Sequence, residues 1–467
     1  MRLTRFFRKG FIFFTSVFLV LAIILTVNRT GRDKEVEREL QKLRDAGYPT
    51  NAAELDAWDK IDSSVENPAS EILNAISLMS KSPVKSTNLL VLGRAELPEF
   101  DQPISNDQMT ALRQFLTTNE ETLKELKRIL NTRPESVRYP VDLSLGFNTL
   151  LPHLSQLKSA AQLFKMDSIY QLETKNNQEA IDSVVQSLTL ARTLEKEPIL
   201  ISQLVRIAMQ SIASSTAELV LNRGSGLTVE QLEQMKQAFT EGVDSDAVSR
   251  SLVGECAMGL DFFVNSPDPK EWNSVVGNNG SNPMVTGAAM SLYRASGFLQ
   301  NDTLFYMRHM SQFAAGTEQS HQERFKTAQE AEAEVGRMRS EFSSKLMLIS
   351  KMLLPALGKA VGKDLGVIAT MEATRTALAV EQYRLKHNDQ VPANLEDLVP
   401  DFLESIPEDP FSGSPVKYRK RERGFVIYSV GADLKDNQGL SRTEAQKLKT
   451  GLPGNDREYD VGFSIKW

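Results

Sequence analysis

The sequence predicts a mainly α-helical protein with an N-terminal transmembrane helix, a helical bundle or irregular solenoid as its body, and a small C-terminal α+β domain. Three observations predict this fold class. Residues 10–27 are apolar and uncharged, apolar residues recur at helical spacing through most of residues 28–365, and strand-like alternation is confined to residues 366–467. The 467 residues are 41% hydrophobic and 24% charged, which is ordinary globular usage and excludes a wholly disordered chain.

Charge and cysteine content exclude two kinds of site. The formal net charge of -6 is mild, so no nucleic-acid partner is expected. Cys256 is the only cysteine, which excludes an intramolecular disulfide and a cysteine-rich zinc site. We interpret this thiol as a small buried hydrophobic group.

The N-terminus carries the strongest single signal. Residues 1–9 contain several basic side chains, whereas residues 10–27 contain no charge. At about 1.5 Å per residue the apolar segment spans about 27 Å, close to the roughly 30 Å hydrocarbon core of a bilayer. Basic residues on the short leading side predict a cytoplasmic tail, and therefore a single-pass membrane protein whose bulk lies outside the cytoplasm. A cleaved signal peptide is the competing interpretation, but bulky Val27 lies where a small-residue cleavage site is needed.

A further interpretation of this region concerns processing. Lys9, Gly10 and Phe11 precede the apolar run and resemble the prepilin peptidase site of type IV pilins and type II secretion pseudopilins. The resemblance implies cleavage after Gly10, which makes Phe11 the first residue of the mature chain. Those families usually carry a glutamate at the fifth mature position, where this sequence has Thr15. Processing is therefore an alternative to a permanent anchor.

Residues 28–365 are expected to form an extracytoplasmic helical domain. A charged helix over residues 33–47 is expected to stop at Gly47, because glycine adopts the left-handed conformation that ends many helices. Further along, Asn106–Asp107 are placed to cap a helix over residues 108–130, whose leucines lie on roughly one face.

The middle of this domain is the most regular part. Residues 157–198 are predicted to form two antiparallel helices joined at Asn176–Asn177, similar to one tetratricopeptide-type hairpin, although no such unit recurs along the chain. Residues 199–221 are mostly apolar, but Arg206 and Glu218 interrupt them. A buried core helix is therefore expected there rather than a second membrane span.

We find no sequence motif for catalysis. The chain has no nucleophile elbow, no phosphate-binding loop and no dinucleotide fingerprint. Its histidines have no metal-ligand spacing, and we expect them to be surface or core residues; they are His153, His309, His321 and His387. No catalytic residue is therefore predicted.

The last hundred residues change in character. A helix is predicted over residues 366–389, and the apolar segment before it, residues 345–362, is predicted to be broken at Pro355. Residues 415–421 and 424–430 alternate as two strands joined by a tight turn, and residues 458–467 supply a final strand. This pattern predicts a small antiparallel sheet.

Residues 366–467 resemble the globular head of type II secretion major pseudopilins. The matching positions are Tyr383-Arg384, Pro392, Leu395, Leu398, Pro407, Asp409-Pro410-Phe411, Gly413, Tyr418, Tyr428-Ser429, Gly431-Ala432-Asp433 and Asp460-Val461. In that family the first helix runs directly from the membrane into the head, whereas here a long helical region intervenes. The whole chain therefore looks more like the large membrane-anchored envelope proteins of planctomycete- and verrucomicrobia-type bacteria.

The resemblance also implies a calcium-binding loop, in which Asp433 and Asp460 match the family by position. Local chemistry adds Asp436, Asn437 and Asp456, because calcium prefers carboxylate and amide oxygens. The spacing does not fit an EF-hand, and the loop contains an inserted basic segment, "LSRTEAQKLKT". Ordinary turn chemistry is the alternative, since Asp, Asn and Gly are favoured in turns.

These observations together favour a membrane-anchored structural or protein-binding protein of the bacterial envelope. Its expected contacts are the lipid bilayer through residues 10–27 and an envelope or secretion-system protein, with calcium as the one candidate cofactor. Two alternatives stay open. One is a component of a pseudopilus-like secretion system, processed after Gly10. The other is an extracytoplasmic ligand-binding module or hydrolase, because fold resemblance alone does not decide function.

Overall fold

The structure is a computed structural model that describes residues 29–59, 67–80, 88–132, 137–243, 246–265, 291, 293–314, 319–338, 347, 350–441, 444–445 and 459–466. The predicted anchor at residues 10–27 and the predicted processing pair, Gly10 and Phe11, lie outside these ranges. Within them, no helix combines the length and the apolar character needed to cross a membrane.

The described fold is mainly helical with one small antiparallel sheet, as the sequence predicts. A first helix covers residues 29–45 and is followed by a turn at Gly47, where the sequence predicts its end. The other elements are α2 Ala52–Trp58, α3 Ala69–Ser77, α4 Asn106–Thr118, α5 Glu120–Leu130, η1 Leu143–Asn148, α6 Pro152–Glu173, α7 Asn177–Arg192, α8 Leu200–Arg223, α9 Val229–Gly242, α10 Ala247–Asn265, α13 Phe298–Ala314, α14 His321–Met338, α15 Ser350–Lys386, η4 Leu395–Leu398, β1 Lys417–Lys420, β2 Phe425–Ser429 and β3 Val461–Ile465.

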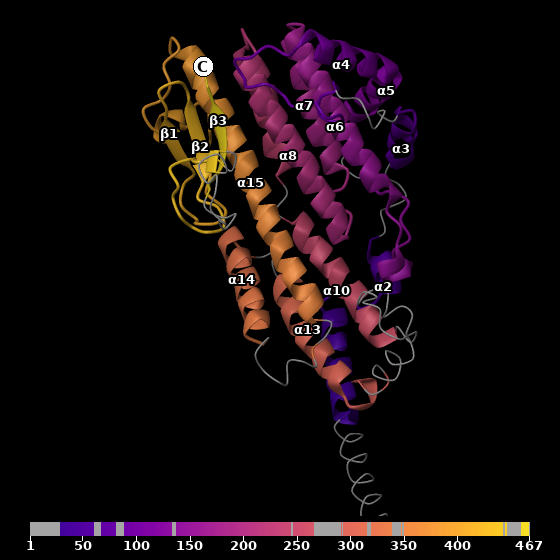
Figure 1. The fold of residues 1–467 in the computed structure, drawn as a ribbon. Helices are drawn as coiled ribbons and strands as arrows, with labels where there is room; N and C mark the ends of the chain where they lie inside the picture. The colour runs from indigo at the N-terminus through magenta and orange to yellow at the C-terminus, as the bar shows by residue number, and fades with distance from the viewer. Residues whose placement is uncertain are drawn as a thin grey trace, which may run out of the picture.

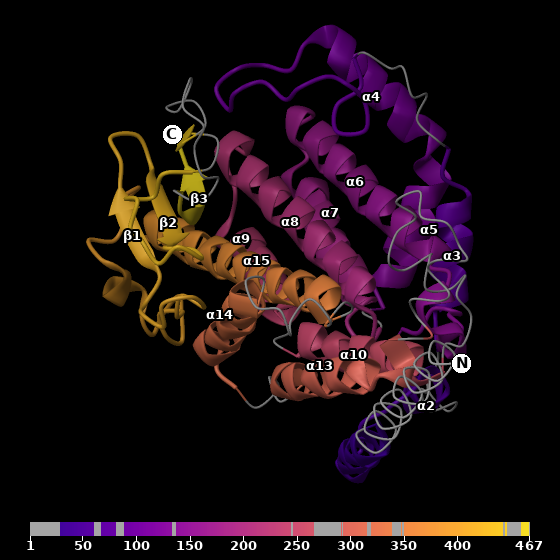
Figure 2. The same ribbon diagram turned by 60° about the horizontal axis from the view of Figure 1, so that its bottom comes forward.

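These elements lie side by side as a series of layers (Figures 1 and 2). The sheet packs against α15, α15 packs against α8, and α8 packs against α6 and α7. On the far side of α6 and α7 lie α3, α4 and α5, whereas α10, α13 and α14 extend the body toward the lower end of Figure 1. The long helix α15 therefore contacts both the sheet and the helical body.

The helix predicted over residues 108–130 is divided in two, and its predicted cap at Asn106–Asp107 is wrong. Ser105 caps it instead: the Ser105 hydroxyl accepts a hydrogen bond from Gln108 N at 3.3 Å, and the Gln108 side chain accepts one from Ser105 N at 3.1 Å. The division falls at Asn119, whose side-chain amide donates to a backbone carbonyl one turn earlier at 2.8 Å. Such local side-chain bonds compete with the helical pattern.

The predicted antiparallel helix pair in residues 157–198 is confirmed by α6 and α7, which a short turn joins. The next predicted core helix is confirmed by α8. Its apolar side chains pack on α6 and α7, and even Arg206 is only 1% exposed. The arginine that interrupts this apolar segment is therefore buried.

The predicted break at Pro355 is wrong, because α15 runs through it. Pro355 is the sixth residue of the helix, so its missing N–H removes only the bond to the Lys351 carbonyl. The start of α15 is held independently, since Ser350 N donates to the buried carboxylate of Asp302 at 3.2 Å.

The sheet has the strand order β1–β2–β3, and both pairs are antiparallel. It confirms all three strands predicted from the sequence. The turn between β1 and β2 requires a glycine, because Gly424 has a φ of 104° and a Cβ there would lie 1.8 Å from the Ile465 carbonyl oxygen.

Asp409 fixes the segment that leads into β1. Its carboxylate is buried and accepts hydrogen bonds from Phe411 N at 2.9 Å, from the Ser429 hydroxyl at 2.8 Å and from Val430 N at 3.0 Å. The aspartate in the Asp-Pro-Phe match therefore ties the loop before β1 to the end of β2.

The outer edge of β3 is bound by side chains of α8. The Glu218 carboxylate accepts a hydrogen bond from Ser464 N at 3.1 Å. The Asn222 side chain donates to the Ser464 carbonyl at 3.0 Å and accepts from Lys466 N at 2.7 Å. Because these contacts satisfy strand groups that would otherwise be open, the helical body completes this edge of the sheet.

The boundary predicted between residues 365 and 366 falls inside α15. Buried residues of the sheet and of the helices belong to one hydrophobic cluster, which includes Phe425 from β2 and Ala377 from α15. Folding of residues 366–467 in isolation stays a prediction, but in the intact chain this region shares its core with the body.

A buried ion network joins α8, α14 and α15. Asp364 of α15 accepts a hydrogen bond from Arg324 Nη2 at 2.8 Å and lies 3.6 Å from Arg206 Nη2. All three side chains are at most 5% exposed. Burial raises the pKa of Asp364, and the two guanidinium groups oppose that rise. Since an unpaired buried charge is costly, these residues depend on one another.

Replacing Asp364 by Asn should therefore destabilise the protein strongly. The change leaves two buried guanidinium groups without their carboxylate, and we expect a loss of about 3–5 kcal/mol in the free energy of unfolding. Urea denaturation measures it. Glu404→Gln, on an exposed loop, is the control and should change stability by less than about 0.5 kcal/mol. A loss for Asp364→Asn no larger than that of the control contradicts the assignment.

Candidate functional site

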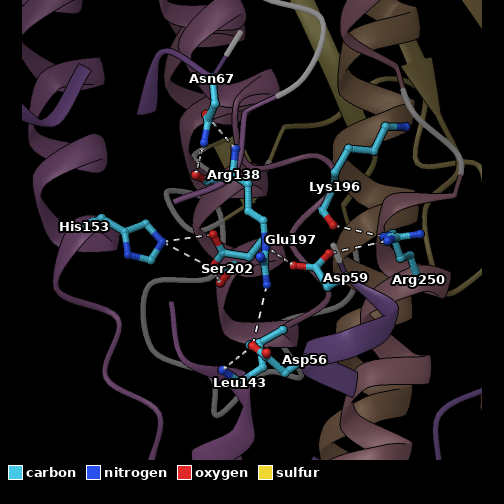
Figure 3. Close-up of polar contacts among 10 residues, drawn as sticks. All are labelled: Asp56, Asp59, Asn67, Arg138, Leu143, His153, Lys196, Glu197, Ser202 and Arg250. Atoms are coloured by element: carbon cyan, nitrogen blue, oxygen red, sulfur yellow. Dashed lines mark hydrogen bonds and ion pairs between the residues drawn. The ribbon is translucent and has the colours of Figure 1, made fainter. Parts of the chain in front are cut away.

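A group of polar contacts surrounds the turn between α7 and α8, and we call it the polar junction (Figure 3). It consists of side chains from α2, α6, α8, α10 and the segments between them. They are Asp56, Asp59, Asn67, Arg138, His153, Glu197, Ser202 and Arg250. These residues are distant in sequence, and the layering of α6, α7, α8 and α10 brings them together.

One half of the polar junction contains a serine, a glutamate and a histidine. The Glu197 carboxylate lies 3.1 Å from His153 Nε2 and accepts a hydrogen bond from the Ser202 hydroxyl at 2.5 Å (Figure 3). The Tyr139 ring stacks on the imidazole with ring centroids 4.7 Å apart. His153, Glu197 and Ser202 are all buried.

The order of these three groups does not match that of a catalytic triad. In a triad the histidine lies between serine and carboxylate, so that it can take the serine proton. Here Glu197 lies between Ser202 and His153, and the Ser202 side chain is fully buried. The arrangement holds the turn before α8 in place, and it presents no nucleophile to a substrate.

The other half of the polar junction is centred on Asp59. Its carboxylate accepts hydrogen bonds from Arg138 Nε at 2.9 Å and from Arg250 Nη2 at 3.4 Å. Burial raises the pKa of Asp59, and the two arginines oppose this effect. Arg250 also lies over the Trp58 ring at 4.2 Å and donates to the Lys196 carbonyl at 3.0 Å. These contacts tie α2 and α10 to the turn before α8.

Gln203 links the polar junction to the buried ion network. Its side-chain amide donates to the Leu194 carbonyl at 2.7 Å and to the Glu197 carbonyl at 2.8 Å, and its oxygen accepts from Arg206 Nε at 2.7 Å. Polar contacts therefore run from α6 through α8 to α14 and α15. A network of this kind fixes the relative positions of helices that apolar packing alone leaves less specific.

Glu255 of α10 lies beside the polar junction. Its carboxylate accepts a hydrogen bond from Leu200 N, at the start of α8, at 3.1 Å. Burial raises the pKa of Glu255 to about 7, and the bond from Leu200 opposes this rise. Part of the side chain reaches the surface, so the shift has less effect on stability than in a fully enclosed site.

His309 is also a buried structural histidine. Its Nδ1 lies 3.0 Å from the Phe305 carbonyl, and its Nε2 lies 3.2 Å from the Glu334 carboxylate, which joins α13 to α14. His153 and His309 are thus core residues with specific partners, which is one of the two settings that the sequence predicts for them.

The residues predicted to bind calcium are brought together only in part. Asp460 accepts hydrogen bonds from Asn437 N at 3.1 Å and Gly439 N at 2.7 Å, so it closes the loop after β2. Asp436 pairs with Lys417 at 3.2 Å. Burial raises the pKa of Asp460, and the negative charges of Asp436 and Asp433 add to this effect.

These hydrogen bonds and this ion pair satisfy many of the polar groups in the loop without a metal ion. Asp433 accepts a hydrogen bond from Lys435 N at 3.0 Å through one carboxylate oxygen. Asp456 lies outside the described residues. Among the residues that the structure does describe, no three acidic, histidine or cysteine side chains converge closely enough to hold a metal ion. Calcium binding stays a prediction from the resemblance.

Three surface grooves add candidate binding regions. The first, of about 630 Å³, lies between α5 and α6, where Lys124 and Tyr170 contribute to its lining. The second, of about 450 Å³, lies between α9 and the end of α15, beside Phe402. The third, of about 330 Å³, lies where the 29–45 helix meets α10 and α13. Each mixes acidic, basic and apolar side chains, so none indicates one class of ligand.

Sequence reasoning missed the polar junction, because His153 and Glu197 lie 44 residues apart and belong to no motif. The sequence does carry a weak signal of buried polar contacts outside the polar junction, in Arg206 and Glu218, the two charges within an otherwise apolar helix. Both turn out to make specific contacts, Arg206 with Asp364 and Glu218 with Ser464.

Replacing Glu255 by Gln should change how stability depends on pH. Because the pKa of Glu255 in the folded chain is above its ordinary value of 4.5, the folded state holds the proton more tightly than the unfolded state. The free energy of unfolding of the unmodified protein should then fall as pH rises from about 4.5 to about 7. Allowing for partial exposure, Glu255→Gln should be more stable by about 2 kcal/mol at pH 8, with no advantage near pH 4.5.

Urea denaturation at several pH values measures this difference. Glu422→Gln, in the exposed turn of the hairpin, is the control and should follow the unmodified protein throughout. Parallel curves for Glu255→Gln and the unmodified protein contradict the assignment.

A calcium site in the loop after β2 predicts stabilisation by the ion. Free calcium at about 100 times Kd should add about 2.7 kcal/mol to the free energy of unfolding, because the ion binds only the folded loop. Thermal denaturation with calcium and with a chelator measures the effect. Asp433→Asn should abolish the difference, whereas Asp142→Asn, in a distant loop, should preserve it. Equal Tm values with calcium and with the chelator exclude the site.

The chain matches no protein-family model, no curated protein and no solved structure.

Proposed function

We propose that this chain is a single-pass bacterial inner-membrane protein whose periplasmic part binds another protein of the envelope or of a secretion system. The basic tail and the apolar residues 10–27 support the anchor. The binding function is supported by a difference between the two edges of the sheet, in whether their outer backbone groups have hydrogen-bond partners. The β3 edge is bound by α8, whereas no residue that the structure describes binds the outer edge of β1.

The hydrogen-bonding pattern identifies the open groups. Arg421 N donates to the Gly424 carbonyl at 3.0 Å, which makes these residues a bonded pair. Bonded and non-bonded pairs alternate along an antiparallel ladder, so the backbone groups of Tyr418 and Lys420 point away from β2. Among the described residues, none donates to or accepts from these outward groups. An extended segment of a partner can add to such an edge as a further strand.

The side chains on this strand favour an acidic partner. Lys420 is exposed, and Arg419 is exposed while it donates to the Gln438 carbonyl at 3.0 Å. Edge lysines also discourage unspecific pairing with other sheets. A segment that carries carboxylates at matching positions therefore gains cross-strand ion pairs that an apolar strand does not.

The described polar clusters support binding rather than catalysis. The serine and histidine of the polar junction are buried on either side of a glutamate, and Asp364 is enclosed by two arginines. Each cluster connects helices, and none of the three grooves contains it. The charged groups of the body thus stabilise a rigid support for the sheet.

Site-specific photocross-linking in the native envelope tests the binding function. A photoreactive residue in place of Lys420 should give a discrete adduct with a partner, because that position lies on the open edge. The matched control is Lys466, which is exposed but lies on the edge that α8 binds, and it should give none. Absence of an adduct at position 420, or equal adducts at both positions, contradicts a binding role for β1.

The pseudopilus alternative differs in one measurable property of the same sample. A mature chain that begins at Phe11 indicates a processed pseudopilin, whereas a chain that begins at Met1 indicates a permanent anchor. Intact mass distinguishes the two.

A further inference from the structure

The outer face of β1, which is turned away from α15, carries basic side chains at alternate positions. Successive side chains of a strand point to opposite faces. Tyr418 is paired with the fully buried Ile427 of β2, so its side chain lies on the core face that packs against α15. Lys417 and Arg419 therefore lie on the outer face, and Arg421, directly after the strand, continues the row.

The loop of residues 436–441, which we call the covering loop, lies over this outer face. Lys417 Nζ lies 3.2 Å from the Asp436 carboxylate within the covering loop. Arg421 Nη1 lies 3.3 Å from the carboxylate of Glu444, just beyond it. Two of the three basic groups in the row are therefore already paired with a carboxylate of the same chain.

Arg419, the middle member of the row, has an uncharged partner. Its Nη1 donates to the Gln438 carbonyl at 3.0 Å. Gln438 has a φ of 63°, which residues other than glycine rarely adopt, and its N–H donates to the Asp436 carboxylate at 2.9 Å. The carbonyl that holds Arg419 is thus fixed by the covering loop. Because Arg419 is exposed and a guanidinium has five N–H donors, donors remain for another group.

Lys420, the next residue along β1, is exposed on the opposite face of the strand. In the part of the chain that the structure describes, no carboxylate pairs with Arg419 or with Lys420. The open edge therefore presents two adjacent cations, one on each face, and the basic groups on either side of Arg419 in its row are neutralised.

We propose that Arg419 and Lys420 determine which strand the β1 edge accepts, namely an extended segment with two adjacent acidic residues between neutral ones. This inference rests on the proposed binding function and names the chemistry of the partner. Adjacent side chains of an added strand also point to opposite faces, so neighbouring carboxylates can meet Arg419 and Lys420 at the same time. Neutral flanks follow, because Lys417 and Arg421 already have their carboxylates.

Two synthetic peptides test the inference with the full chain in detergent. Both consist of threonine, valine and two glutamates and carry the same fluorophore. The glutamates are adjacent in the first peptide and three positions apart in the second, so the second cannot pair with Arg419 and Lys420 together. Fluorescence anisotropy measures the two Kd values. We expect the first peptide to bind about threefold more tightly, which is the size of one exposed cross-strand ion pair.

Three variants show which residues produce this preference. Arg419→Gln should abolish it, whereas Arg128→Gln, on the exposed surface of α5 and far from β1 in Figure 1, should preserve it. Gly439→Ala leaves the charge unchanged but should displace the covering loop, because a Cβ there would lie 2.7 Å from a Val426 methyl group. Loss of the preference in Gly439→Ala is expected if the covering loop positions Arg419, and charge alone does not produce it.

Equal binding of the two peptides overturns the inference, and so does a preference that survives Arg419→Gln. A preference that Gly439→Ala leaves intact overturns the positioning role of the covering loop. A single-stranded oligonucleotide that binds as tightly as the first peptide also overturns the inference, because the edge then recognises charge alone. The photocross-link at position 420 in the native envelope separates the two proposals. If it forms while the peptides bind equally, only this inference fails; if it does not form, the binding function itself fails.

Discussion

The ion pairing of Asp364 with Arg206 and Arg324 is the interaction on which the rest of the structure depends. It joins the three helices α8, α14 and α15, and α15 carries the sheet on its other side. Buried charges contribute little net stability when they are paired, but they are costly when they are mispaired. Helix register in this body is therefore set by polar contacts, and the apolar residues around them fill the remaining volume.

Pairing of buried polar groups also explains why a buried histidine, serine and glutamate occur together in an order that differs from that of a catalytic triad. Glu197 makes contacts on both sides, and Gln203 continues the contacts toward Arg206. Each of these groups is bound by a neighbouring side chain. A substrate would have to displace those contacts and then enter a closed core, so the physical role of the polar junction is to define how α6, α8 and α10 meet.

Local patterns in the sequence predicted much of the fold, whereas contacts across the fold could not be read from them. The α6–α7 pair and the three strands follow from periodicity and from Gly424, which are properties of neighbouring residues. The continuation of α15 through Pro355 was missed, because the start of that helix is held by Asp302, a residue far away in sequence. The polar junction was missed for the same reason. Of the predicted calcium residues, Asp460 does close its loop, although it does so through backbone N–H groups.

The contact between α8 and β3 has a consequence for folding kinetics. Glu218 and Ser464 are separated by 246 positions, so this contact has a very high sequence separation. Helical pairs such as α6 and α7 can form early, because their contacts are local, whereas closure of the sheet on α8 must wait for a long loop to be ordered. Until that step, the outer edge of β3 stays unpaired and open to other strands. Protection against aggregation is therefore needed during this interval, and it is needed most at the sheet.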